Sequence, residues 1–159
     1  MTDILRRFKD LPPKTFASGE VLLEEGRSSG RLFVLKSGTV TVIRDGVVIA
    51  SIAEPGAVFG EMSLLLDRPH TASVVAATAV EVWGFGDGLN YLEHHPALAV
   101  HVAVLLAQRL ENTTGLVGRL KAGATEKRSD TGLFERLIGF LTGHPPGTKT
   151  GGPGQPRPR

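Results

Sequence analysis

The sequence predicts a mainly β domain with flanking helices (α+β), in which an antiparallel β-roll of the jelly-roll type lies between a short N-terminal helix and a long C-terminal helix. Short β-rich runs separated by glycines fill residues 14–86, and Asp45-Gly46 joins two of them as a hairpin. After Gly88 the apolar residues follow a helical period instead. The strands are too numerous and too evenly spaced for a parallel α/β fold, so a closed antiparallel roll is expected.

The N-terminal half supplies a helix and then the strands. A short helix is predicted over 3–10, and it ends before Pro12-Pro13 because a residue that precedes proline is pushed out of helical geometry. A two-residue hairpin turn needs positive φ at both positions, which Asp45-Gly46 tolerates. The predicted strands lie at Val21–Leu23, Leu32–Leu35, Val40–Ile43, Val47–Ile49, about 71–77 and about 79–85.

Two helices are predicted after the roll. Asp87 is a candidate cap for a helix that ends at His94-His95, and Pro96 suits the first position of a longer helix that runs to about Lys121. This long helix carries two apolar stripes. The first is a heptad seam of Ala99, Ala103, Leu106, Leu110, Thr113, Val117 and Leu120, and the second consists of Leu98, Val102 and Leu105.

The second stripe is expected to pack on the roll, and the seam is expected to form a homodimer through helix 97–120. The alternative is that both stripes pack within one monomer.

The composition limits the possible functions. A chain of 159 residues with 41% hydrophobic residues buries one ordinary core, so 1–121 is expected to be one domain, 122–142 a linker with a short amphipathic helix, and 143–159 a Gly/Pro-rich disordered tail. No apolar run approaches the roughly 20 residues of a membrane span, which predicts a cytoplasmic protein. The chain has no cysteine, and its net charge of +2 is too small to argue for nucleic acid.

One stretch carries a resemblance. Phe59–Ala76 reads FGEMSLLLDRPHTASVVA and resembles the phosphate-binding cassette of the cyclic nucleotide-binding domain family. The spacing of glycines and apolar residues before it, from Phe16 through Gly26 to Val40, follows the same family, and the resemblance spans roughly 14–120. It implies a stand-alone regulatory domain with cAMP or cGMP as its ligand.

The cassette residues supply the chemistry that such a ligand needs. Glu61 is the candidate acceptor for a ribose hydroxyl, and the backbone N–H groups of Gly60 to Ser63 are candidate donors to the phosphate. The alternative is that Gly60 only turns the chain while Glu61 caps the following turn. The predicted ligand-binding residues of the cassette are Phe59, Gly60, Glu61, Met62, Ser63, His70, Thr71 and Ala72.

His70 stands where the family places an arginine. Arginine presents a permanently charged fork to two phosphate oxygens, whereas a neutral histidine offers one useful donor, so the change would weaken binding about 10- to 150-fold without compensation. A bound phosphate would raise the pKa of His70, and Arg68 is a further candidate that could turn toward the anion, although a solvated loop arginine is the simpler interpretation. The remaining alternative is a degenerate loop that binds no nucleotide.

The resemblance also implies contacts outside the phosphate. A hydroxyl at Thr71 permits cGMP without requiring it, and the small Ala72 lets its strand pack behind the cassette. Thr113 and Thr114 are similar to the family's base-contacting pair on the long helix. Ordinary surface threonines explain them equally well.

Other function classes lack their residues. Adjacent histidines such as His94 and His95 point about 100° apart on a helix, residues 14–69 contain no histidine for a cupin-type metal site, and no nucleophile elbow or P-loop occurs. We therefore expect no enzyme and no metal.

The C-terminal region decides between kinds of output. The 38 residues after Lys121 leave no room for a winged helix-turn-helix, so nucleic acid is not expected as a partner. The apolar face of helix 133–142 either docks an unknown protein partner or packs on its own domain. The predicted function is a cAMP or cGMP sensor that repositions its C-terminal helices, and the alternative is a ligand-independent interaction module of the same fold.

Overall fold

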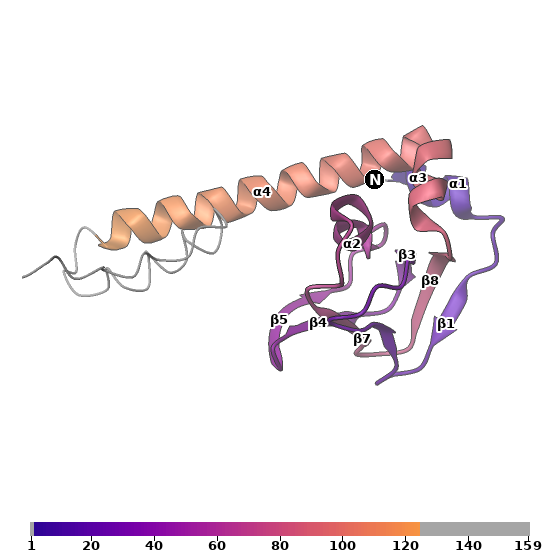
Figure 1. Cartoon of the computed structure of the whole chain (residues 1–159), viewed down its shortest axis with the longest axis horizontal. Coiled ribbons are helices and arrows are strands. Elements are labelled where there is room, and N and C mark those ends of the chain that lie inside the picture. The colour runs from indigo at the N-terminus through magenta and orange to yellow at the C-terminus, as the bar shows by residue number, and fades with distance from the viewer. Residues whose placement is uncertain (1, 125–159) are drawn as a thin grey trace, which may run out of the picture. The chain divides into compact units, whose positions relative to one another are not determined.

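The computed structural model describes residues 2–124 (Figure 1), so the predicted 133–142 helix and the 143–159 tail lie outside the described residues. The elements follow in the order α1 (Thr2–Phe8), β1 (Lys14–Phe16), β2 (Val21–Leu23), β3 (Leu32–Ser37), β4 (Val40–Arg44), β5 (Val47–Ile52), β6 (Val58–Phe59), α2 (Glu61–Leu66), β7 (Ser73–Ala76), β8 (Val80–Phe85), α3 (Gly88–His94) and α4 (Pro96–Ala124).

Two four-stranded antiparallel sheets form the roll. Their strand orders are β1-β8-β3-β6 and β2-β7-β4-β5, which confirms the predicted antiparallel β-roll with a short N-terminal and a long C-terminal helix. Every predicted strand is present. The prediction missed β1 and β6, because β1 has one large apolar residue among three and β6 is only two residues long.

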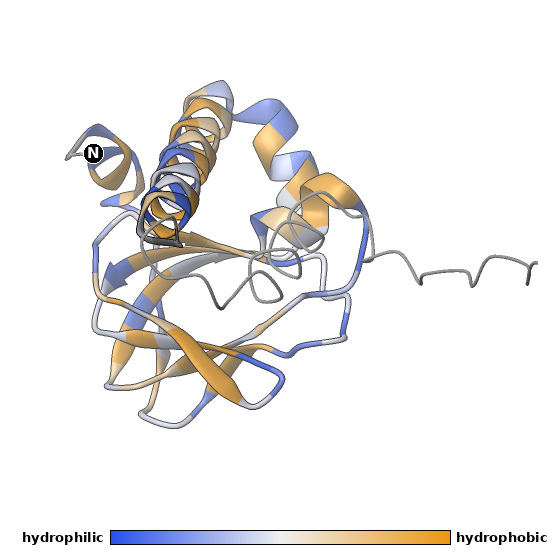
Figure 2. Cartoon of the chain, turned by 90° about the vertical axis from the view of Figure 1, so that its left-hand side faces the viewer, coloured by the Kyte–Doolittle hydropathy of each residue, from blue (hydrophilic) through white to orange (hydrophobic). Residues whose placement is uncertain are grey.

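Strand β3 explains how the core is divided. Phe33 and Leu35 point into the roll between the sheets, whereas Leu32 and Val34 point outward under the helices, as the alternation of side chains along a strand requires. The run is apolar throughout because both faces are buried. Figure 2 shows hydrophobic ribbon along strands of the roll and on stretches of the helices, and more hydrophilic ribbon in the turns of the roll.

The local signals at turns and caps are confirmed. Asp45 and Gly46 both have positive φ, of 50° and 74°, at the hairpin between β4 and β5. The Asp87 carboxylate caps α3 by accepting the Asn90 N–H at 3.3 Å. The helix ends at His94, and Pro96 begins α4, as predicted.

The chain divides into two compact units, residues 1–109 and 110–159, and the boundary falls within α4. In the first unit, the second stripe of the long helix packs on the roll as predicted. Leu98 and Val102 are buried in the core cluster that includes Leu32 and Val34, and Leu105 packs against that cluster. Two seam residues, Ala99 and Leu106, also pack partly against this core of their own domain. The homodimer stays a prediction. Within residues 2–124, no helix is both long and apolar enough to span a membrane.

Candidate functional site

A pocket of about 230 Å³ opens in the roll beside the cassette; we call it the roll pocket. All eight cassette residues that the sequence singled out line it, namely Phe59, Gly60, Glu61, Met62, Ser63, His70, Thr71 and Ala72. The rest of its wall comes from the strands and from α4, and consists of Leu23, Val42, Ile49, Ala50, Ile52, Val58, Val74 and Arg109. The fold therefore gathers the predicted cassette around one largely apolar cavity.

Gly60 allows the cassette to turn between β6 and α2. Its φ is +92°, in the left-handed region that favours glycine, and a Cβ built on it would lie 2.3 Å from the Arg31 carbonyl oxygen. No side chain caps α2 at this end. At its other end, the Ser63 hydroxyl donates to the Arg68 carbonyl at 2.5 Å and closes the turn. The cassette thus keeps its shape through backbone geometry that only glycine adopts without strain.

Glu61 is buried and paired. Its side chain is 5% exposed, and its carboxylate accepts a charge-assisted hydrogen bond from the Arg109 guanidinium. The same guanidinium donates to the Val58 carbonyl at 3.1 Å. Arg109 therefore joins the N-terminal part of α4 to both β6 and the cassette. The acceptor predicted for a ribose hydroxyl already carries a positive partner.

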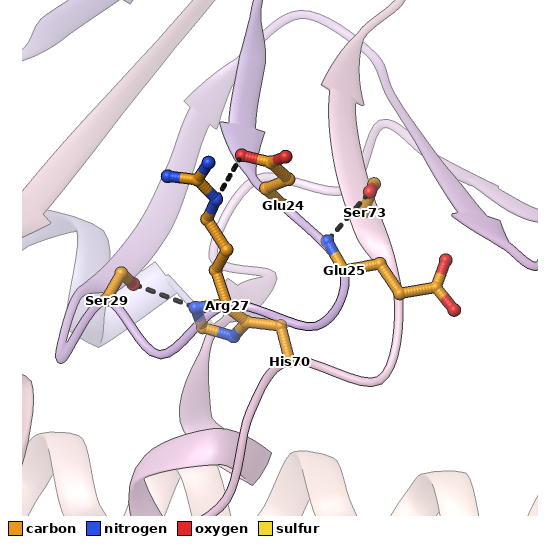
Figure 3. Close-up of polar contacts among 6 residues, drawn as sticks. All are labelled: Glu24, Glu25, Arg27, Ser29, His70 and Ser73. Atoms are coloured by element: carbon orange, nitrogen blue, oxygen red, sulfur yellow. Dashed lines mark hydrogen bonds and ion pairs between the residues drawn. The ribbon is translucent and has the colours of Figure 1, made fainter.

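His70 is buried, with 6% of its surface exposed, and is tied to the loop between β2 and β3. Its Nε2 lies 2.8 Å from the Ser29 hydroxyl oxygen (Figure 3). Its backbone N–H donates to the Arg27 carbonyl at 2.9 Å, and its carbonyl accepts the Gly26 N–H at 2.8 Å. Burial lowers the pKa of the His70 imidazole from its ordinary value of 6.5, so the ring is mostly uncharged at neutral pH.

Three charged residues of that loop, Glu24, Glu25 and Arg27, have hydrogen-bond or ion-pair partners other than the His70 ring. Arg27 pairs with Glu24 at 3.0 Å, and both side chains are exposed. The Glu25 carboxylate accepts the Asp45 backbone N–H at 3.1 Å, and Figure 3 shows this carboxylate turned away from the imidazole. Three charged side chains of the loop thus bond to groups other than the His70 imidazole.

The less central predictions have different outcomes. Arg68 lines a second pocket together with Asp67 and Asp87, and it is not among the residues that line the roll pocket. Thr113 and Thr114 lie in the second unit, where the Thr114 hydroxyl donates to the Leu110 carbonyl at 2.8 Å. Their contact with a base stays a prediction.

Two residues of the site were missed from the sequence. Arg109 lies one helical turn before Thr113, so the helical period could have placed it on the same face as the predicted base contacts. Ser29 belongs to a Ser-Ser-Gly stretch that indicates only a turn. Its pairing with His70 joins residues 41 apart, which no local pattern reveals.

The two histidines at the C-terminal end of α3 bond to backbone carbonyl groups of that helix. The Nδ1 atoms of His94 and His95 lie 2.8 Å from the carbonyl oxygens of Asn90 and Tyr91, one turn earlier, and donate to them. Over residues 2–124, no group of three or more acidic or histidine side chains could hold a metal ion.

Comparison with known proteins places this geometry in a family. Residues 13–87 match the sequence model of the cyclic nucleotide-binding domain. The acetyltransferase Pat of Mycolicibacterium smegmatis is 36% identical over 104 residues, which cover 63% of this chain and 31% of that protein. The cAMP-dependent protein kinase regulatory subunit of Yarrowia lipolytica is 35% identical over 75 residues, which cover 47% of this chain and 20% of the subunit.

A cGMP-dependent protein kinase of Toxoplasma gondii is 34% identical over 84 residues, which cover 52% of this chain and 8% of the kinase. The chain therefore matches less than a third of the length of each of these relatives.

Solved structures share the fold. The catabolite activator protein of Thermus thermophilus superposes with a TM-score of 0.59 at 22% identity, over 90% of this chain and 76% of that one. A second domain of a protein kinase A regulatory subunit, bound to Sp-2Cl-cAMPS, gives a TM-score of 0.53 at 22% identity, over 74% and 84% of the two chains.

The fold and the site together define a β-roll domain with an interior pocket. An arginine of α4, Arg109, lines this pocket together with the cassette. The match over residues 13–87 identifies that part of the chain as a cyclic nucleotide-binding domain.

Proposed function

We propose that this domain binds cAMP or cGMP in the roll pocket and regulates a partner by repositioning α3 and α4. The observation that carries the proposal is the ion pair between Glu61 and Arg109, because it connects the predicted ribose acceptor directly to α4. Two relatives named above are a cGMP-dependent kinase and a cAMP-dependent regulatory subunit, which favours a cyclic nucleotide as the ligand class.

The ligand's parts meet different walls of the roll pocket. A ribose hydroxyl would donate to Glu61, and the phosphate would lie toward His70 and the backbone N–H groups that follow Gly60. The base would contact the apolar wall, which includes Ile49 and Ile52. A hydroxyl that competes for Glu61 changes how tightly Arg109 is held. Binding therefore biases the position of α4, which is the two-state element of the mechanism.

Isothermal titration of the full chain with cAMP and cGMP at pH 7.5 tests the binding. We expect micromolar affinity for at least one of them, and a loss of at least tenfold in Glu61→Gln, because the amide accepts the ribose hydroxyl without charge assistance. Glu54→Gln is the matched control, since Glu54 is exposed and lies outside the roll pocket. No heat with either nucleotide would contradict the proposal.

Helix movement needs its own measurement. The chain has no cysteine, so cysteines placed at the exposed Val47 and Val104 would be the sole sites for paired spin labels. We expect the distance distribution between the labels to shift when a saturating nucleotide is added. A ligand that binds without any shift would contradict the mechanism while leaving the binding intact.

One observation favours the second candidate, a ligand-independent interaction module. Glu61 and His70 both have hydrogen-bond partners within the domain itself, so neither needs a nucleotide to satisfy it. Titration of His70→Arg separates the two candidates. Binding that appears only in His70→Arg would identify an intact pocket that no longer serves a cyclic nucleotide, and the partner would then be a protein.

A further inference from the structure

The roll pocket has no net charge. Within residues 2–124, its lining holds one acidic and one basic side chain besides His70, and these two, Glu61 and Arg109, pair with each other. Arg68, the arginine of the cassette segment, lines a second pocket instead. An anion that enters the roll pocket would therefore leave water without meeting an uncompensated cation.

His70 does not supply that cation. It is buried, and burial lowers its pKa. Its Nε2 is already hydrogen-bonded to Ser29, whose oxygen also accepts the Arg31 N–H at 3.3 Å. One ring nitrogen remains, and a neutral imidazole offers at most one donor through it. A single neutral donor bonds a phosphate oxygen more strongly than it bonds a hydroxyl, but that gain is set against the cost of taking the phosphate's charge out of water.

The backbone donors are neutral as well. Helix α2 has six residues, so its dipole adds little attraction for a charge. Peptide N–H groups donate to hydroxyl oxygens as well as to phosphate oxygens, and the stronger bond to the charged oxygen must offset the desolvation of the phosphate. By contrast, the two features that recognise the rest of a nucleoside are complete: the Glu61 carboxylate accepts a ribose hydroxyl, and the apolar wall around Ile49, Ile52 and Val74 receives a base.

We propose that uncharged nucleosides, with a base and a ribose but no phosphate, are ligands of the roll pocket and bind at neutral pH about as tightly as the corresponding cyclic nucleotides. The proposal rests on the proposed function, because it assumes the same pocket and the same contacts to ribose and base. It concerns the class of ligand: the pocket discriminates through the ribose and the base, and gains little from the phosphate.

The test is a titration of the full chain with adenosine, cAMP, guanosine and cGMP at pH 7.5. We expect a nucleoside to bind within about threefold of its cyclic counterpart. We also expect His70→Arg to tighten the binding of the cyclic nucleotide about 10- to 150-fold and to leave that of the nucleoside unchanged, because only the phosphate gains a charge-assisted bond. The control is His94→Arg, which adds the same charge at the exposed end of α3.

Each outcome separates the two proposals. A cyclic nucleotide that binds wild type more than about tenfold tighter than its nucleoside overturns the nucleoside proposal and leaves the proposed function standing. A nucleoside that binds while both cyclic nucleotides fail overturns cyclic-nucleotide sensing and the expected equal affinity, and shows a pocket that takes nucleosides alone. No binding of any of the four ligands overturns both. Thermal melting of His70→Arg and His94→Arg verifies that each variant is folded, and the wild-type titrations alone decide the proposal.

Discussion

Replacing Arg109 with methionine removes the cation of Glu61 while keeping an apolar stem of similar length. The Glu61 side chain is 5% exposed, so its carboxylate would stay buried without its partner. Removing one member of a fully buried ion pair typically costs about 3–5 kcal/mol. The Arg109 side chain is 43% exposed, which weakens the pair, and its hydrogen bond to the Val58 carbonyl is also lost. We expect a loss of about 2–3 kcal/mol in the free energy of unfolding.

Urea unfolding at pH 7.5 measures this loss, and a double-mutant cycle assigns it. Glu61→Gln removes the buried charge, so Arg109→Met is expected to cost about 1 kcal/mol or less in that background, which gives a coupling energy of about 1–2 kcal/mol. Arg119→Met is the control, because Arg119 is an exposed arginine later on the same helix. A cost below about 0.5 kcal/mol, equal in both backgrounds, would refute the inference that this pair fastens α4 to the cassette.

Three further predictions concern other features. Gly60→Ala is expected to lose about 1–3 kcal/mol in urea unfolding from its φ of +92° alone, with a further cost from the Arg31 carbonyl; a stability like wild type would contradict the geometry. Because burial holds the pKa of His70 below 6.5, the unfolded chain takes up the proton first, so stability should fall as the pH drops below 6.5. A flatter profile in His70→Gln would verify the source, and an unchanged slope would exclude it. Sedimentation is expected to show a wild-type dimer and monomeric Leu110→Glu; a wild-type monomer would exclude the seam.

Binding should depend on pH in the opposite direction from stability. A bound phosphate favours the imidazolium, so the pKa of His70 rises when a cyclic nucleotide binds. Affinity for cAMP is therefore expected to increase as the pH falls from 7.5 to 6.0, by less than tenfold per pH unit, while affinity for adenosine stays constant. Titration at the two pH values, with His70→Gln as the control, measures this. A parallel change for both ligands would show that His70 does not face the phosphate.

Local signals predicted the elements of this fold wherever they are strong. The run Leu32–Leu35 is apolar on both faces, as a strand buried on both sides is, and Asp45-Gly46 indicated the hairpin between β4 and β5 directly. Strand β6 has two residues and forms only through its pairing with β3. No local feature of the sequence around it indicates this pairing. Tertiary pairing therefore decided the elements that local propensity could not.

The site divides in the same way. The cassette is continuous in sequence, so its residues were predicted together and the roll pocket gathers them. Arg109 and Ser29 approach the cassette from 48 and 41 residues away along the chain, and each has an unremarkable local context. Arg109 neutralises the charge of Glu61, and Ser29 is hydrogen-bonded to the buried His70 ring. The cassette part of the site was therefore predictable, whereas the partners that set its electrostatics required the three-dimensional structure.

Strand β3 separates the two hydrophobic core clusters and contributes side chains to both. The side chains that fill the interior of the roll and those that support the helix layer alternate along the same six residues. Both faces of β3 are closely packed. A helix that shifts against Leu32 or Val34 would therefore strain the backbone of β3, and the same backbone holds Phe33 and Leu35 in place on the other face. Sequence drift on one side of the strand is therefore constrained by the other, and the roll and its helices are expected to lose their structure in one cooperative step.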